Sequence, residues 1–349
     1  MWKEVLLNYG IFLLELLTVF GVLAFIVMLI LEAKKQPEEG SISVVNLTEK
    51  FTEQQKALEV CFLSEEELKQ QEKVEKKAEK EKAKAEKKRL KAGEEKPEEQ
   101  KARLFLLSFE GDVHAHGVES LRKEISAILS IAKPQDEVLL KLESPGGVVH
   151  GYGLAASQLK RLREREIPLT IAVDKVAASG GYMMACLANK IVAAPFAVIG
   201  SVGVVAEVPN IHRLLKKHDI DVDVMTAGEY KRTVTLMGEN TEKGKQKFQQ
   251  ELEATHQLFK DFVKTNRPQL DIEKVATGEH WYGQQALDLN LIDEISTSDD
   301  LLLAAVKEKE VIEIKFKEKK KLAQRIGAQV ELSLENLIGK LWNKRSHIM

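Results

Sequence analysis

Short apolar segments alternate with amphipathic ones from residue 103 onward, and this alternation restricts the fold more than any other feature of the sequence. The runs 103–109, 138–142 and 169–173 are rich in apolar residues, as buried strands are. Between them, segments 118–131 and 150–165 carry apolar residues at helical spacing along one face. Strands that alternate with helices predict an α/β domain with mostly parallel strands and helical crossovers.

The alternation continues toward the C-terminal part of the chain. Further predicted strands are 191–194, 202–205 and 222–225, and further predicted helices are 211–218, 241–265 and 284–288. Asn290 follows the last helix, where a residue in the left-handed conformation commonly ends the helical path.

An almost uninterrupted apolar run covers residues 11–31 and is broken chiefly by Glu15 and Thr18. Its length matches the ~20 residues that a helix needs to cross the hydrocarbon core of a bilayer. The run exceeds the ~7–15 apolar residues of a signal peptide, and no small-residue cleavage site follows it. We therefore expect a short tail at 1–10 and an uncleaved transmembrane anchor at 11–31, with the lipid bilayer as a partner.

The charges that flank the anchor give a weak indication of its orientation. Lys3 and the amino terminus precede the run, whereas Lys34, Lys35 and Lys50 follow it. The positive-inside rule therefore slightly favours a cytoplasmic location for the bulk of the chain.

Composition divides the rest of the chain into four segments. A juxtamembrane segment at 32–63 is mixed in character, and from 64 to 101 glutamate and lysine alternate in blocks. Such a charged segment buries no core, so we expect a spacer that is either helical or disordered. The ordered domain follows at 102–316. The tail at 317–349 begins strongly basic and predicts an amphipathic helix that packs on the body or on a neighbouring subunit; a membrane-surface helix is the alternative.

The overall composition bears on partners and cofactors. The formal net charge of -2 gives no global case for a nucleic-acid partner. Cys61 and Cys186 are the only cysteines and lie far apart, so neither a disulfide framework nor a Cys-x-x-Cys metal site is expected. We expect no metal and no cofactor.

The candidate nucleophile lies in the sequence Ala-Ala-Ser-Gly-Gly-Tyr-Met-Met-Ala at 177–185, which follows a predicted strand. Good helix formers after Gly180 predict that a helix begins there. Ser179 would then lie where helical N–H groups are unpaired and the helix dipole favours negative charge, as an acyl-transfer nucleophile requires. The alternative is an ordinary N-cap serine, and the segment alone leaves both interpretations open.

A glycine-rich turn, Ser-Pro-Gly-Gly at 144–147, follows the strand predicted at 138–142. Its glycines allow the backbone to approach a ligand closely and to point N–H groups at it. An oxyanion hole usually draws on two backbone segments, so this turn is a candidate for the second donor. The same four residues are also common in ordinary turns.

The general base stays open between histidine and lysine. The candidate histidines are His114, His116, His150, His212, His218, His256 and His280, with His347 in the tail, and none has a local signature. Lys231 follows a predicted strand, and a lysine acts as a base only when burial lowers its pKa by several units. A surface lysine is the ordinary alternative.

Four motifs occur in an order that resembles the signal peptide peptidase (SppA) family of Ser–Lys serine proteases. They are the segments 144–147, 177–182, 200–204 and 228–231. The resemblance covers the catalytic region from about residue 103 to residue 310. A single N-terminal span, a charged spacer and one catalytic unit are similar to the SohB branch of that family.

The resemblance implies a role for each of five residues. Ser179 would be the nucleophile and Lys231 the general base, with the Ser201 hydroxyl orienting the lysine. The backbone N–H groups of Gly147 and Gly180 would form the oxyanion hole.

Two positions depart from the family pattern. Arg232 stands where a serine or another small residue usually follows the lysine, which affects local subsites rather than the dyad. Asn290 begins the sequence Asn-Leu-Ile-Asp where the family has Gly-Leu-Val-Asp, and asparagine tolerates a left-handed conformation.

The family also implies a fold, an assembly and a location. The fold is of the ClpP/crotonase type, a spiral of β-β-α units, and the dyad assembles across neighbouring protomers of a homo-oligomeric ring. The catalytic domain lies in the periplasm at the inner (plasma) membrane of a Gram-negative bacterium. We give this implication more weight than the small charge difference around the anchor.

The resemblance therefore implies a membrane-anchored serine endopeptidase that acts through an acyl-enzyme. Its substrates would be peptides, such as remnant signal peptides or membrane-associated fragments. One alternative is a crotonase-type acyl-CoA enzyme, because the fold and the oxyanion hole are shared. Another is a non-catalytic membrane scaffold of the same fold.

Overall fold

The computed structural model describes residues 9–21, 40–64 and 101–317, together with the isolated positions 77, 80, 81 and 84. The chain divides into a compact unit at 42–315 and a second unit that joins residues 1–41 and 316–349.

Little of the two chain ends is described. Residues 9–21 form a helix with exposed apolar side chains, and no described helix has both the length and the apolar character to span a bilayer. The predicted anchor at 11–31 extends beyond these residues, and the predicted spacer is described mainly at four helical positions. The tail predicted at 317–349 lies outside the described residues except for Lys317.

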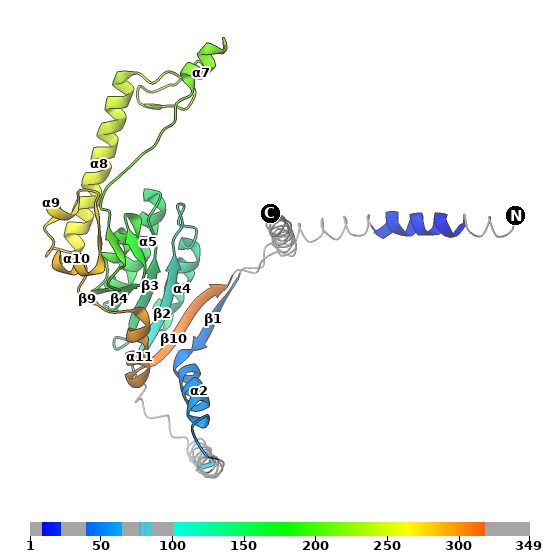
Figure 1. Ribbon diagram of the computed structural model, residues 1–349, viewed down its shortest axis with the longest axis vertical. Helices are drawn as coiled ribbons and strands as arrows, with labels where there is room; N and C mark the ends of the chain where they lie inside the picture. The colour runs from blue at the N-terminus through cyan, green and yellow to red at the C-terminus, as the bar shows by residue number, and fades with distance from the viewer. Residues whose placement is uncertain are drawn as a thin grey trace, which may run out of the picture. The chain divides into compact units, whose positions relative to one another are not determined.

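A seven-stranded sheet forms the centre of the 42–315 unit (Figure 1). In order across the sheet its strands are β1 (Ser41–Asn46), β10 (Glu310–Lys317), β2 (Arg103–Glu110), β3 (Glu137–Glu143), β4 (Leu169–Val173), β6 (Lys190–Ala193) and β9 (Glu294–Ile295). The strands from β10 to β9 pair in parallel. The predicted α/β class and its parallel pairing are confirmed.

A three-stranded sheet is joined to the main sheet by a bridge between Ser144 and Ala177. Its strands are β5 (Val176–Ala178), β7 (Val198–Gly200) and β8 (His280–Tyr282), with β5 and β7 parallel and β7 and β8 antiparallel. Twice in succession a main-sheet strand is followed by a small-sheet strand and a helix: β4, β5, α6 (Gly180–Ala185), then β6, β7, α7 (His212–Lys217). This is the β-β-α order that the resemblance implies, while the complete spiral stays a prediction.

Helices cover both faces of the main sheet. On one face α4 (Val118–Ile131), α5 (Val149–Glu164) and α6 share an apolar core with the strands. On the other face α11 (Ser298–Glu308) and α2 (Leu47–Val60) pack against a smaller core. The remaining helices are α8 (Glu242–Asn266), α9 (Ile272–Val275) and α10 (Gly283–Asp288).

The two cores explain the apolar runs of the sequence. Along β2, Phe105, Leu107 and Phe109 belong to one core, and Leu104 and Leu106 belong to the other. Side chains alternate across a sheet, so a strand that is covered on both faces needs apolar residues at nearly every position.

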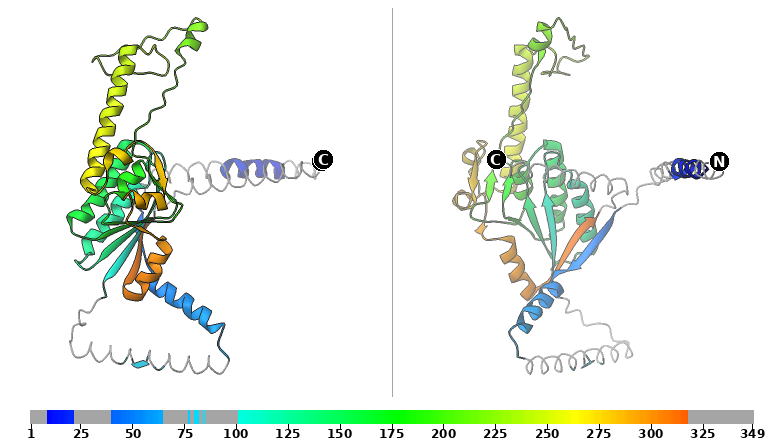
Figure 2. Two further views of the ribbon diagram at one scale, coloured as in Figure 1. Left: turned by 60° about the vertical axis from the view of Figure 1, so that its left-hand side comes forward. Right: turned by 45° about the vertical axis from the view of Figure 1, so that its right-hand side comes forward.

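The segment between β7 and α8 leaves the body of this unit. Figures 1 and 2 show α8 extending away from the sheets, with α7 near its far end. The buried residues of α8, Phe259 and Val263, lie in its C-terminal part. We call residues 204–247 the arm.

Two predicted strands between β7 and α8 are wrong. The segments 202–205 and 222–225 are not strands, and Val205 and Met225 are 84% and 89% exposed. An apolar run forms a strand only where a sheet edge satisfies its backbone hydrogen bonds. Within the described chain these two runs have no such neighbour, so their apolar pattern alone was misleading.

The juxtamembrane segment predicted at 32–63 contains two elements that the sequence analysis missed. β1 joins the edge of the main sheet beside β10, and α2 begins after an Asn46 cap. The Asn46 side chain also donates to Glu310, and the Thr48 hydroxyl accepts from the N–H of Val311. These contacts hold this part of the chain against the sheet.

An ion pair connects the C-terminal end of α8 to the residues before β9. The Arg267 side chain, 4% exposed, donates to both carboxylate oxygens of Asp293 at 2.8 Å. Asp293 also accepts from the N–H of Ile191 at 2.7 Å, and Arg267 donates to the carbonyl of Asn290. Asn290 has a φ of 60°, so the predicted left-handed stop is confirmed. Burial alone would raise the pKa of Asp293, but the hydrogen bonds and the Arg267 charge hold this pKa below its usual range.

Replacing Asp293 with asparagine should lower the free energy of unfolding at neutral pH by about 2–3 kcal/mol, because Arg267 would keep its buried charge without a counter-charge. The folded-state pKa of Asp293 is lowered, so its contribution is present above the unfolded pKa of about 3.9 and is lost as the pH falls through the folded value. The difference between wild type and D293N should therefore shrink below about pH 4. Urea unfolding across this pH range measures both effects.

Glu294→Gln is the matched control, because the Glu294–Lys190 pair is half-exposed and is expected to contribute less than about 1 kcal/mol. If D293N cost no more stability than E294Q, the Arg267–Asp293 pair would not hold this region together.

Candidate active site

Ser179 lies at the junction between β5 and α6, where the backbone is strained. Its φ of 52° and ψ of -117° fall outside the low-energy regions of an L-residue. The N–H of Ser179 donates to the carbonyl of Gly200 at 2.8 Å, and its carbonyl accepts from the N–H of Met183 at 2.9 Å. A strand, a strained serine and a helix in succession form the type of sharp turn that exposes a nucleophile.

The Ser179 hydroxyl does not cap the helix. It forms no capping hydrogen bond with the first turn of α6, so the N-cap interpretation lacks the contact on which a cap depends. The residue is half-buried and lines a cavity. Its hydroxyl is therefore available to a ligand.

The glycine-rich turn after β3 lies against Ser179. Gly146 has a φ of 91°, and a Cβ added to it would lie 2.7 Å from the Cβ of Ser179 and 2.8 Å from the nitrogen of Gly180. A Cβ on Gly147 would overlap the Val113 carbonyl. The close approach of the two predicted turns thus requires glycine at 146, and the close approach of the loop after β2 requires glycine at 147.

Two backbone donors flank Ser179. The N–H of Gly146 is already used, because it donates to the Ser144 hydroxyl at 3.1 Å. Among the described residues, no acceptor is paired with the N–H of Gly147 or of Gly180. Gly180 is also the first residue of α6, where helical N–H groups lack intrahelical partners. Two free donors beside a serine are the components of an oxyanion hole.

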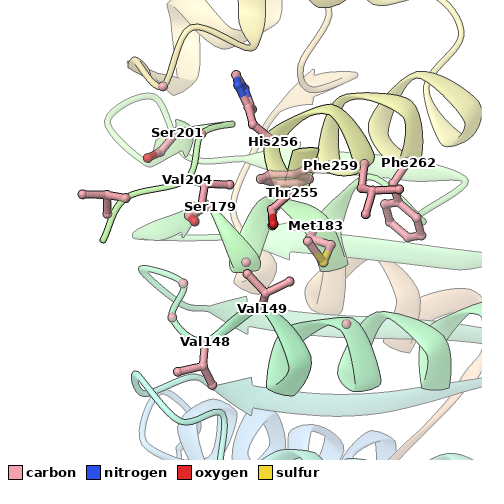
Figure 3. Close-up of a pocket in the computed structure, with 18 of the residues that line it drawn as sticks. Val148, Val149, Ser179, Met183, Ser201, Val204, Thr255, His256, Phe259 and Phe262 are labelled. Atoms are coloured by element: carbon pink, nitrogen blue, oxygen red, sulfur yellow. The ribbon is translucent and has the colours of Figure 1, made fainter. Parts of the chain in front are cut away.

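Both turns open into a cavity of about 1020 Å³. Its lining comes from the loops that follow β2, β3, β5 and β7, the loop before β8, and helices α5, α6 and α8. Figure 3 shows Ser179 between α8 on one side and the Val148–Val149 segment on the other. The carboxyl ends of parallel strands are where α/β sheets commonly bind ligands.

Ser201 and His256 line the same cavity. Ser201 follows β7 with a φ of 51°, and its N–H donates to the Glu279 carbonyl at 2.7 Å. The Nε2 atom of His256 lies 3.1 Å from the carbonyl oxygen of Val202. The residues that line the cavity include no other histidine and no lysine or carboxylate.

Lys231 does not line this cavity. It is exposed and lies in a turn of the arm, where its N–H donates to the Gly228 carbonyl. Its neighbour Glu229 pairs with Lys243 in the first turn of α8, whereas His256 lies far along the same helix. At ~1.5 Å per residue, Lys243 and His256 are about 20 Å apart.

Four of the five predicted site residues therefore meet within one chain, and one does not. Those brought together are Ser179, Ser201, Gly147 and Gly180. Lys231 is separated from the other four by most of the length of α8.

Tyr152 is a residue of this region that the sequence analysis missed. It is fully buried, and its ring fills the space where a Cβ on Gly180 would lie. In the sequence it is one position on the apolar face of an amphipathic helix, and no local motif distinguishes it.

Two family descriptions match the chain, "Peptidase family S49 N-terminal" over residues 4–159 and "Peptidase family S49" over residues 161–312. A probable protease SohB of Haemophilus influenzae is 60% identical over 348 residues, which cover 99% of either chain. A probable protease SohB of Buchnera aphidicola is 54% identical over 71% of this chain and 74% of the relative. A putative signal peptide peptidase SppA of Enterococcus faecium is 28% identical over 50% of this chain and 51% of the relative.

Among solved structures, a mutant of the 1510-N membrane-bound stomatin-specific protease in complex with a substrate peptide covers 65% of this chain and 98% of its own. Its TM-score of 0.41 and identity of 14% are too low to carry an argument about the site.

The strain at Ser179 predicts an unusual effect on stability. Ser179→Gly should raise the free energy of unfolding by about 1 kcal/mol, because glycine adopts a positive φ without steric cost. Ser179→Ala should leave stability nearly unchanged, since no capping hydrogen bond is lost. Thermal unfolding measures both. Ser126→Gly, in the helical backbone of α4, is the control and should be destabilising; a fall in stability for S179G as well would contradict the strained geometry.

Proposed function

Because this chain belongs to peptidase family S49, a family of proteases, we propose that it is a serine endopeptidase in which Ser179 attacks the peptide carbonyl. The observation that carries the proposal is the strained Ser179 turn, which opens into the cavity between two free glycine N–H donors. Such donors stabilise the negative charge that develops on the carbonyl oxygen.

The proposed reaction proceeds through an acyl-enzyme. The neutral Lys231 amine takes the proton of the Ser179 hydroxyl as its oxygen bonds to the carbonyl carbon, and the N–H groups of Gly147 and Gly180 bind the oxyanion. The lysine then returns the proton to the departing amine as the peptide bond breaks. A water molecule, deprotonated by the same lysine, releases the acyl group and restores Ser179. In this scheme Ser201 orients the lysine.

We propose that Lys231 acts on Ser179 of a neighbouring copy of the chain. The length of α8 keeps the Lys231 turn about 20 Å from the cavity of its own chain, at ~1.5 Å per residue. Docking of the arm on a second copy would remove the Lys231 side chain from water, and desolvation favours the neutral form of an amine. A homo-oligomer, such as a ring, would then be the active form.

The surface of the arm supports this assembly. Large apolar side chains of the arm are exposed: Val205, Leu214, Ile220, Met225, Tyr230 and Met237. An apolar surface of this kind commonly marks a protein interface. Interface formation would bury it at the same time as it delivers the lysine.

His256 is the second candidate for the base. It is the histidine in the cavity lining, although its Nε2 atom is engaged with the Val202 carbonyl. A histidine base would make each chain self-sufficient, whereas a lysine base requires the oligomer. The two proposals therefore differ in a measurable way.

The apolar part of the cavity supports a preference for apolar side chains beside the cleaved bond. Met183, Phe259 and Phe262 line it, together with Val148 and Val149. Burying a large aliphatic side chain there would contribute about 1.5–3 kcal/mol to binding. Signal-peptide remnants and membrane-associated fragments are rich in such side chains, so they are the proposed substrate class.

We further propose that residues 11–31 anchor the protein in the bacterial inner membrane with the peptidase domain in the periplasm. The length and apolar character of this run support the anchor. Protease added to spheroplasts should degrade residues 102–316 while the membrane is intact; protection until the membrane is lysed would place the domain in the cytoplasm.

The dyad predicts that Ser179→Ala and Lys231→Ala each lower kcat/KM for a fluorogenic peptide by at least about 10³-fold, without loss of the oligomer. Co-expression of the two variants should restore activity, because roughly a quarter of randomly formed interfaces would pair an intact serine with an intact lysine. Detergent-solubilised full-length protein is used throughout. His256→Ala is the matched comparison at the second candidate base.

Several results would overturn parts of this proposal. Retained cleavage in Ser179→Ala would exclude Ser179 as the nucleophile, and the absence of cleavage in the wild type would favour the acyl-CoA enzyme or the scaffold. Retained cleavage in Lys231→Ala with loss in His256→Ala would assign the base to the histidine. Loss in Lys231→Ala without recovery in the mixed oligomer would exclude sharing of the dyad between copies.

The cavity predicts a change of specificity at Gly153. Gly153 of α5 lines the cavity, and a Cβ added to it meets no atom within 4 Å. Gly153→Leu should therefore raise KM for peptides with leucine or phenylalanine before the cleaved bond by about 10-fold or more, and affect alanine peptides less. The helix itself should gain stability, since glycine is a poor helix former. Ser157→Leu, one turn later on α5 and outside the lining, is the control; equal effects of the two variants would contradict the assignment of this subsite.

A further inference from the structure

We infer that Ser144 and Tyr152 form a positioning pair that sets the separation of the two oxyanion donors. This inference rests on the proposed function, because it concerns the Gly147 and Gly180 donors. Neither residue lines the cavity itself, and both are fully buried behind the lining. Ser144 is the first residue of the glycine-rich turn after β3, and Tyr152 lies between that turn and the start of α6.

The hydrogen-bond directions within the pair follow from the contacts. The Tyr152 hydroxyl donates its proton to the carbonyl of Asp112 at 2.8 Å. The Ser144 hydroxyl lies 2.5 Å from the Tyr152 oxygen. Because the single hydroxyl proton of Tyr152 is donated to Asp112, Ser144 is the donor in this contact. The Ser144 oxygen then accepts from the N–H of Gly146 at 3.1 Å. A series of hydrogen bonds therefore runs from Gly146 through Ser144 and Tyr152 to Asp112, and each bond has one donor and one acceptor.

The backbone of Ser144 connects the same pair to the nucleophile strand. Its N–H donates to the carbonyl of Val176 at 2.8 Å, and its carbonyl accepts from the N–H of Ala178 at 3.0 Å. A Cβ on Gly181 would lie 2.5 Å from that carbonyl oxygen. Ser144 is therefore packed against the start of α6 as well as bonded to the residue before Ser179.

The ring of Tyr152 completes the connection. A Cβ added to Gly180 would overlap the ring carbons of Tyr152, so the ring is in contact with the backbone that carries the second donor. The hydroxyl of the same ring holds Ser144, which in turn holds Gly146. The Tyr152 side chain thus contacts the start of α6 through its ring and the glycine-rich turn after β3 through its hydroxyl.

The protonation state of Tyr152 suits this role. Burial, more than any charge nearby, raises the pKa of its hydroxyl above the ordinary value. Asp112, whose carbonyl accepts from Tyr152, is held by its own side chain: the carboxylate accepts hydrogen bonds from the ring and from the backbone N–H of His116. These bonds lower the pKa of the Asp112 carboxyl to about 2. The phenol therefore remains a donor throughout the range in which a peptidase acts.

A purely structural role is the alternative, since buried hydroxyls are normally hydrogen-bonded wherever they occur. The two roles differ in what they change. Loss of a structural bond lowers stability, whereas displacement of an oxyanion donor lowers the rate of the chemical step and leaves substrate binding in place.

Tyr152→Phe tests the inference, because it removes the hydroxyl and keeps the ring against Gly180. Its kcat for a fluorogenic leucine peptide should fall by about 10-fold or more, with KM nearly unchanged. The matched control is Tyr182→Phe, which removes another fully buried hydroxyl that donates to the Leu291 carbonyl at 2.9 Å. That variant should lose thermal stability while keeping kcat. Equal catalytic constants in both variants would overturn the inference.

A double-mutant cycle adds a second criterion. Ser144→Ala should lower kcat as Tyr152→Phe does, and the double variant should be no slower than the slower single variant, because both interrupt one chain of hydrogen bonds. Independent, multiplying effects would contradict a shared role.

Hydrogen exchange separates this inference from the proposed function. In Tyr152→Phe, exchange of the hydrogen-bonded amides of Gly146 and Val148 should be faster than in wild type by about 10-fold, whereas Tyr182→Phe should leave it unchanged. This measurement needs no enzymatic activity. If wild type cleaves no peptide, or if Ser179→Ala cleaves as well as wild type, the proposed function fails, and the exchange result still decides whether the pair holds the turn.

Discussion

Burial of the main sheet on both faces is the constraint on which the rest of the structure depends. Helices α4, α5 and α6 cover one face and α11 and α2 cover the other, so the strands themselves carry almost no polar chemistry. Polar function is left to the loops at the carboxyl ends of the parallel strands, where several turns converge. The cavity beside Ser179 lies at this edge, and its lining includes the loops after β2, β3, β5 and β7.

Close packing at this edge makes the site. Gly146, Gly147 and Gly180 each lie where a Cβ would collide with a neighbour, and Ser179 adopts a backbone conformation that costs on the order of 1–3 kcal/mol. The β5–β7 ladder and the bond from Ser179 to Gly200 hold that strain. A rigid environment of this kind suits electrostatic stabilisation of a transition state, which depends on donors that are oriented before the substrate arrives.

The arm divides the proposed catalytic machinery. One chain supplies the serine, the donors and the cavity, while its Lys231 lies in the arm among exposed apolar side chains and away from the cavity. If the dyad is formed between copies, assembly controls activity, because an isolated chain holds a nucleophile without its base. Such control would limit proteolysis to the assembled form of the protein.

The sequence by itself determined the α/β class, most of the central strands and helices, the two glycine-bearing turns and the position of Ser179 at a strand-to-helix junction. These features depend on local periodicity and on residues that are neighbours in the chain. Only the tertiary structure decided that segments 202–205 and 222–225 remain outside any sheet, that β1 and α2 pack on the domain, and that Lys231 is remote from the cavity. It also decided the Ser144–Tyr152 contact, which joins the end of a strand to a buried helix face. A strand needs a partner and a hydrogen bond needs two side chains that meet, and which segments meet is set by packing rather than by local pattern.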